Sequence, residues 1–156
     1  MEITRDDLFV QTSPDRPDLL DNWRWLVGPE AKLFLVSSLG DAFLMDSNGV
    51  NWLNVGDGSY TKVAESVADF QSMLSSPDKV NEWFFPQLVG DILTAGLTRA
   101  PNECFGFKLA PVLGGEYEPQ NFEPTDLLSH FSMLGQIHEQ VRDLPEGTPI
   151  LGVKTE

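Results

Sequence analysis

The sequence is poor in cysteine, in histidine and in positive charge. Among 156 residues there are one cysteine, Cys104, and two histidines. A single cysteine excludes an internal disulfide and a zinc site built from several cysteines. No apolar run approaches the roughly 18 residues that a membrane-spanning helix needs. Residues 1–7 are acidic and lack the basic and apolar stretches of a secretory signal. These absences favour a cytoplasmic location.

Positive charge is scarce relative to negative charge. Ten Lys and Arg stand against 24 Asp and Glu, for a net charge of −14. Nucleic acids and anionic membranes are therefore disfavoured as partners, because both attract basic surfaces. A basic protein partner fits this field, since opposite net charges raise the rate of association. Plain solubility is the other explanation of the acidic composition.

Turn signals dominate the first half of the chain. Asn48-Gly49 is the strongest hairpin signal, because a type I′ turn needs positive φ at both positions. Apolar stretches that alternate with such turns predict an antiparallel meander of about four strands within residues 32–64. We expect a later strand, 105–109, to join the same sheet. Residues 121–127 are expected near a sheet edge, because Pro119 and Pro124 cannot donate ladder hydrogen bonds.

Helical spacing of apolar residues predicts the remaining elements. Helices are expected at residues 19–27, 66–75, 78–95 and 128–142. Pro86 either kinks the third of these or opens a new helix at its first position. The predicted class is α+β, an antiparallel meander packed against several helices. Without repeats or linkers, residues 1–156 are interpreted as one domain with a partly irregular arm at 1–17.

Few residues offer catalytic or metal-binding chemistry. His130 and His138 lie eight positions apart on one predicted helix, about 12 Å from each other, which is too far to share a metal. We expect His130 to face solvent and His138 to be a partly buried core residue. Cys104 is expected to be a small core residue. No nucleotide loop or nucleophile elbow is present, so we predict no cofactor, no metal and no catalytic site.

An acidic stretch is the most distinctive charge pattern. No Lys or Arg occurs between Lys108 and Arg142, whereas this stretch contains four acids placed close together. These are Glu116, Glu118, Glu123 and Asp126. They are interpreted as a solvated loop, as a surface that faces a partner, or as paired carboxylates of a hydrolase.

The same region contains an ordered set of motifs. Gly-Gly-Glu-Tyr occupies 114–117, Asn121 and Glu123 follow, and Gly-Gln-Ile-His occupies 135–138. This set resembles the C-terminal domain of bacterial type VI secretion immunity proteins, whose members often carry a GAD-like N-terminal region. Proteins of that family neutralise the DNase toxins that are encoded beside them in competing bacteria.

The resemblance implies a protein that is not an enzyme and that occludes the basic substrate cleft of a nuclease effector domain. It implies a monomer or a 1:1 complex with this toxin. The glycines, His and Gln of the motifs are interpreted as structural, and the variable acids as toxin contacts. The expected toxin-binding residues are Asp57, Glu116, Tyr117, Glu118, Glu123 and Asp126. The alternative is a small cytoplasmic hydrolase that uses the acidic loop or a Cys104–His138 pair.

Overall fold

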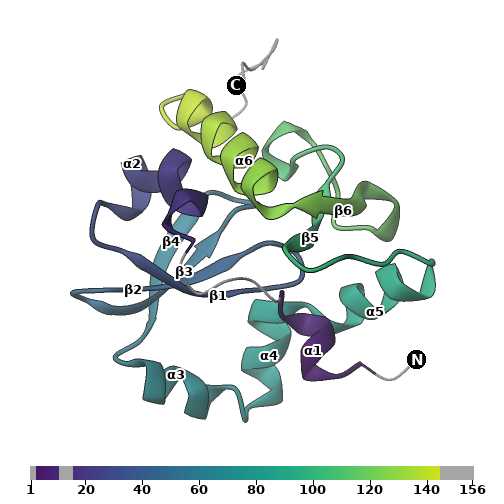
Figure 1. Cartoon of the computed structure of the whole chain (residues 1–156), viewed down its shortest axis with the longest axis horizontal. Helices are drawn as coiled ribbons and strands as arrows, with labels where there is room; N and C mark the ends of the chain where they lie inside the picture. The colour runs from purple at the N-terminus through teal and green to yellow at the C-terminus, as the bar shows by residue number, and fades with distance from the viewer. Residues whose placement is uncertain (1–2, 11–15, 145–156) are drawn as a thin grey trace.

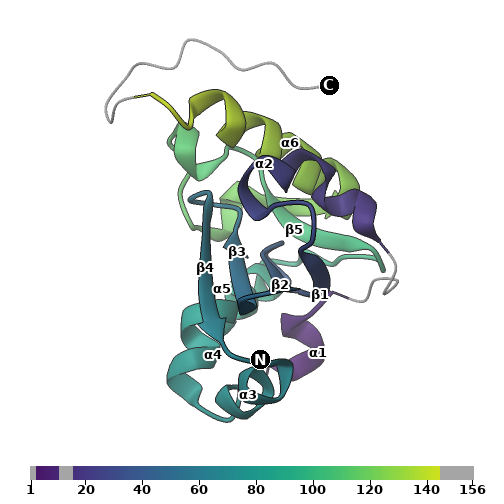
Figure 2. The same cartoon turned by 90° about the vertical axis from the view of Figure 1, so that its left-hand side faces the viewer.

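A computed structural model describes residues 3–10 and 16–144 of the chain. The described part is an α+β fold in which a four-stranded sheet lies between two groups of helices (Figures 1 and 2). The strands are β1 (Lys32–Val36), β2 (Ala42–Asp46), β3 (Gly49–Asn54), β4 (Ser59–Ala64), β5 (Glu103–Phe107) and β6 (Phe122–Asp126). The α-helices are α1 (Arg5–Leu8), α2 (Arg24–Val27), α3 (Val67–Met73), α4 (Pro77–Phe84), α5 (Pro86–Thr94) and α6 (Leu127–Val141). Short 3₁₀ helices are η1 (Pro17–Trp23), η2 (Pro111–Leu113) and η3 (Pro119–Asn121).

Strands β1 to β4 form the predicted antiparallel meander, in sequence order. The type I′ turn predicted at 48–49 is wrong. Asp46 pairs with Gly49, so the two-residue connection is Ser47 and Asn48, and Gly49 (φ +123°) already belongs to β3. The Asp46 carboxylate accepts the N–H of Asn48 at 2.8 Å, which turns the chain before the glycine.

The prediction that residues 105–109 join the meander is also wrong. Strand β5 pairs with β6 in a separate two-stranded sheet, in which Gly106 lies opposite Glu123. A backbone hydrogen bond joins β5 to the turn after β1, from the N–H of Phe105 to the carbonyl of Ser38. The outer edge of β1 is already occupied, because Val10 donates its N–H to Val36. Strand β6 supplies the partner that this edge cannot offer.

The helices below the sheet cover an aromatic core. Phe43 of β2 contacts Phe70, Trp83 and Phe84, with ring centroids 4.8 to 5.7 Å apart. All four side chains are buried. Pro86 opens α5 as a separate helix, and Phe85 joins it to α4 in the left-handed conformation (φ 52°). This sharp joint turns α5 toward the two-stranded sheet.

On the other side of the sheet, α6 lies directly against η1. A Cβ at Gly135 would come within 2.4 Å of the Asn22 carbonyl oxygen, so only glycine permits this approach. The indole N–H of Trp23 donates to the carbonyl of Phe131 at 2.9 Å. No helix of the described ranges is long and apolar enough to cross a membrane.

Candidate functional site

Both histidines bind main-chain carbonyls. The expectation that His130 faces solvent is wrong, since the side chain is 1% exposed and its Nε2 lies 3.0 Å from the Gly40 carbonyl. The missing side chain of Gly40 (φ +84°) makes room for the ring. Burial lowers the pKa of His130 to about 4, so the ring is neutral. His138 is buried as expected and binds the Val55 carbonyl at 2.9 Å, and burial lowers its pKa too.

Cys104 is a core residue, as predicted. The side chain is fully buried, and burial raises the pKa of the thiol, which disfavours the thiolate needed for nucleophilic attack. No hydrogen bond joins this thiol to either histidine ring within residues 3–10 and 16–144. Within the same ranges, no three His, Cys, Asp or Glu side chains come together as a metal site. The Cys104–His138 pair of the alternative hydrolase is therefore not formed.

The β5–β6 connection, residues 108–121, is held in shape by Asn121. Its Nδ2 donates to the carbonyls of Leu109 and Glu116, and its Oδ1 accepts the N–H of Leu109, each at 2.9 Å. Gly115 lies against the Leu109 carbonyl, where a Cβ would come within 1.8 Å. Two residues of the sequence motifs, Gly115 and Asn121, thus determine the path of this loop.

Tyr117 joins the connection to the rest of the fold. Its ring stacks on Phe85 with centroids 5.9 Å apart and meets Phe107 edge-on at 5.4 Å. The hydroxyl lies over Gly56, where a Cβ would come within 2.0 Å of it. Burial, with Asp41 and Asp57 nearby, raises the Tyr117 pKa, so the hydroxyl keeps its proton. The contact brings the connection against the β3–β4 turn.

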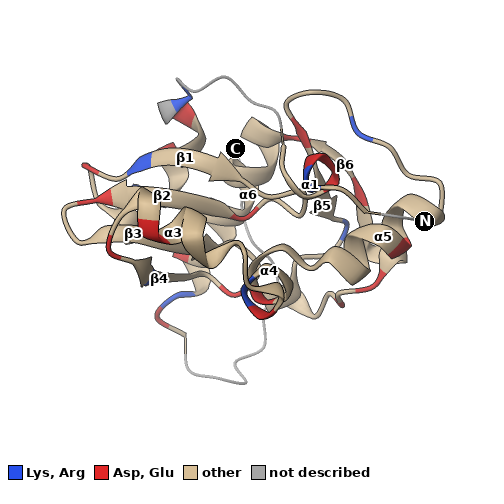
Figure 3. Cartoon of the chain, turned by 90° about the horizontal axis from the view of Figure 1, so that it is seen from below, with Lys and Arg blue, Asp and Glu red and all other residues tan. Residues whose placement is uncertain are grey.

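A groove of about 590 Å³ runs between the α4–α5 joint and the connection. We call it the acidic groove. Its apolar lining comes from Phe85, Pro86, Leu88, Tyr117 and Pro119, and its polar lining from Asn81, Gln87, Asp91 and Glu118. None of these described lining residues is Lys or Arg. In the view from below, a red acidic position is visible on α5 (Figure 3).

The residues predicted to bind a partner fall into two groups. Asp57 neighbours Tyr117 across Gly56, and Glu116 and Glu118 flank Tyr117 in the connection, so four of the six gather near the acidic groove. Glu123 and Asp126 lie instead on β6. All five acids are exposed.

Asp126 has a structural task besides any binding role. Its carboxylate accepts the N–H of Ser129 at 3.1 Å and so caps the N-terminus of α6.

Sequence reasoning missed Asp91 and Phe85 as groove residues. Neither residue stands out in the sequence. Asp91 is a single acid on a predicted helix, and Phe85 is one of several apolar residues before Pro86.

Comparison with known proteins identifies the family. Residues 64–138, from the end of β4 into the last turns of α6, match the family described as T6SS immunity protein Tdi1, C-terminal. The second half of the chain, residues 64–138, thus matches this family of type VI secretion immunity proteins. A search of curated proteins finds no match. All residues that line the acidic groove fall within the matched segment.

Glycines and histidines in and near the motifs serve the packing of the fold. Gly106 lets His130 approach, since a Cβ there would lie 3.0 Å from Nδ1, and Gly135 admits η1. His138 ties α6 to the carbonyl of Val55 in the sheet. An immunity protein binds a cognate toxin. The exposed acids, which none of these contacts requires, are thus left as the candidates for toxin recognition.

Proposed function

We propose that this immunity protein neutralises a nuclease toxin by inserting the acidic groove and its neighbouring acids into the basic substrate cleft of the toxin. One observation carries the proposal: an exposed groove with two carboxylates, an aromatic floor and no basic lining residue, on a chain of net charge −14. A nuclease cleft carries Lys and Arg because it must neutralise phosphates. The carboxylates of the groove would bind the same Lys and Arg side chains of the toxin that otherwise bind the phosphates of the nucleic acid.

The groove suits an arginine side chain in particular. Asp91 and Glu118 offer oxygens from its two sides, from α5 and from the connection. Charge-assisted hydrogen bonds to a guanidinium are roughly twice as strong as neutral ones. The stacked rings of Phe85 and Tyr117 add a π surface on which a cation gains about 0.5–1 kcal/mol at an exposed site. Carboxylates and rings together favour Arg over Lys, which lacks the planar group.

Long-range charge supports fast capture of the toxin. The connection carries Glu116 and Glu118 on its exposed side, and Asp57 lies on the adjacent turn. Such a cluster attracts a basic cleft over a distance comparable with the Debye length, about 8 Å at physiological salt. The association rate should therefore fall steeply as salt is added.

The test is a double charge reversal, Asp91→Lys with Glu118→Lys. Both side chains are exposed, so the fold should survive. The matched control, Asp21→Lys with Glu139→Lys, changes the net charge equally at exposed positions on η1 and α6. Binding to a catalytically inactive form of the adjacently encoded toxin is measured by surface plasmon resonance at low and moderate salt.

We expect the groove variant to lose about thirtyfold or more in affinity, since unpairing interfacial charges costs on the order of 2–5 kcal/mol. The control variant should slow association slightly and leave dissociation unchanged. Equal behaviour of the two variants would remove the groove from the interface. A toxin that degrades no DNA, or that degrades it at the same rate with the immunity protein present, would overturn the proposed function itself.

A further inference from the structure

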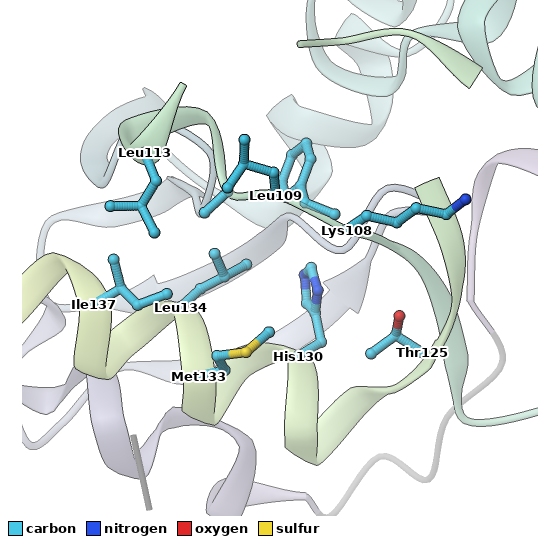
Figure 4. A pocket seen from close by; sticks show the side chains of 10 residues that line it. Lys108, Leu109, Leu113, Thr125, His130, Met133, Leu134 and Ile137 are labelled. Atoms are coloured by element: carbon cyan, nitrogen blue, oxygen red, sulfur yellow. The ribbon is translucent and has the colours of Figure 1, made fainter. Parts of the chain in front are cut away.

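The β5–β6 connection also forms one wall of a second hollow, on the side of α6. This α6 pocket has a volume of about 220 Å³. Figure 4 shows Leu113 of the connection pointing toward Leu134 and Ile137 of α6, with His130 farther along the lining, next to Thr125. Leu109 and Met133, at its rim, are 47% and 39% exposed. Solvent-exposed apolar side chains thus surround an open apolar pocket, a combination typical of a protein interaction site.

The floor of the α6 pocket carries an unused hydrogen-bond acceptor. Because the neutral His130 ring donates from Nε2 to Gly40, its Nδ1 holds a lone pair. Nδ1 faces Gly106, where a Cβ would lie 3.0 Å from it, and it makes no hydrogen bond with any described residue. The neighbouring Thr125 hydroxyl is already engaged, since it donates to the carbonyl of Glu123 at 2.9 Å. The pocket therefore offers apolar walls and one acceptor.

We propose that the α6 pocket receives a tyrosine side chain of the toxin, whose hydroxyl donates to Nδ1 of His130. The inference rests on the proposed function. A cavity of about 150 Å³ accepts a benzene ring, so the α6 pocket is large enough for one aromatic side chain. A buried tyrosine hydroxyl needs a partner, and tyrosine is enriched among the residues that dominate binding energy.

The position of the pocket identifies the toxin as the source of this side chain. Leu109 and Leu113 face the α6 pocket, whereas Tyr117 and Glu118 of the same connection face the acidic groove. A partner that covers the connection meets both hollows. Glu123 stands on the same face of β6 as Thr125 and adds negative charge beside the pocket, which suits a basic partner. A second copy of the chain fits poorly, because two surfaces of net charge −14 repel each other.

The pocket itself can be tested on the free protein with p-cresol, the analogue of a tyrosine side chain, and with toluene, which lacks the hydroxyl. Titration is followed by the methyl resonance of Met133 and the ring resonances of His130. We expect p-cresol to shift both sets and to bind several-fold more tightly than toluene, since only p-cresol satisfies Nδ1. Equal affinity of the two probes, or no shift with either, would refute the assigned tyrosine.

The interface is tested with two substitutions on α6, Met133→Glu and Leu128→Glu. The two side chains are similarly exposed, 39% and 41%, but only Met133 lines the pocket. We expect Met133→Glu to lower toxin affinity by about tenfold or more, mainly through faster dissociation, as for a central anchor. Leu128→Glu should stay within about twofold of wild type. Circular dichroism confirms that both variants are folded.

The outcomes separate this inference from the proposed function. If Met133→Glu binds toxin like Leu128→Glu while the groove reversal weakens binding, the tyrosine pocket is refuted and the proposed function stands. If the wild-type chain forms a dimer that Met133→Glu dissociates, a second copy fills the pocket and the inference is likewise refuted. If the toxin is not neutralised at all, the proposed function fails whatever the probes show.

Discussion

Asp41 is the buried acid whose replacement is expected to stabilise this protein. The carboxylate lies in the core at the start of β2, where its Oδ1 accepts the N–H of Val55 at 3.0 Å. Burial, with a smaller contribution from the negative charge of Asp57, raises its pKa from 3.8 to about 7. Asparagine has nearly the same shape, keeps the acceptor for Val55 and never ionises. The substitution Asp41→Asn therefore removes the cost of a buried charge.

The magnitude follows from the pKa. A folded-state pKa near 7 against 3.8 in the unfolded chain corresponds to about 4 kcal/mol. Because the folded pKa is the higher one, this stability is fully present below pH 4 and is lost as the pH rises through 7. At pH 8 the variant Asp41→Asn avoids this loss of about 4 kcal/mol in unfolding free energy. Burying the new amide N–H₂ costs about 1–3 kcal/mol of that gain. We expect the variant to be more stable than wild type by about 2 kcal/mol at pH 8.

His130 acts in the opposite direction over part of the same range. Its pKa is lowered from 6.5 to about 4, so the stability from its neutral ring is lost as the pH falls from 6.5 toward 4. That loss is about 3 kcal/mol, and the lowered pKa of His138 adds to it. In wild type, raising the pH from 4 to 6.5 lowers the unfolding free energy through Asp41 and raises it through the histidines, so the two effects oppose each other. In Asp41→Asn only the histidine slope remains, so stability should rise with pH and then level off.

Urea unfolding at pH 5, 6, 7 and 8, followed by tryptophan fluorescence, measures both effects. The control is Asp91→Asn, which removes one exposed charge from α5 and touches no buried group. A variant Asp41→Asn that is less stable than wild type at pH 8 would refute the reasoning. So would a pH profile that keeps the shape of the wild-type profile.

Two further predictions concern residues of the motifs. Gly135→Ala should destabilise the fold by about 1–3 kcal/mol, because its Cβ would overlap the Asn22 carbonyl; thermal unfolding measures this against Gly90→Ala, a helical glycine with room for a methyl group, which should be neutral or stabilising. Asn121→Ala should loosen the connection through the loss of three hydrogen bonds, each worth about 0.5–1.5 kcal/mol. Hydrogen exchange should then accelerate at Leu109, and toxin affinity should fall with it. Unchanged exchange there would mean that other contacts hold the loop.

The sequence alone determined those features that depend on neighbouring residues. The meander follows from turns between short apolar runs, since an antiparallel hairpin needs only a few residues to close. Pro86 and the cap at Ser66, whose hydroxyl accepts the N–H of Asp69, begin helices through local geometry. The motif set around 114–138 identified the immunity family for a similar reason, because the order of its residues is readable without a fold.

Tertiary structure decided which distant segments meet. Strand β5 pairs with β6 rather than with the meander because residues 9–10 already occupy the edge of β1. His130 is buried because the gap left by Gly40, 90 positions earlier in the chain, lies above it. Periodicity within one helix carries no information about such a gap.

Both hollows beside the connection depend on contacts between distant residues. The acidic groove exists because the left-handed joint at Phe85 turns α5 toward Tyr117, and the α6 pocket reaches His130 because Gly106 has no side chain beside the ring. The sequence could supply the acids and the absence of bases between Lys108 and Arg142. Their grouping around aromatic and apolar surfaces depends on contacts between residues far apart in the chain, and only the folded chain brings these together.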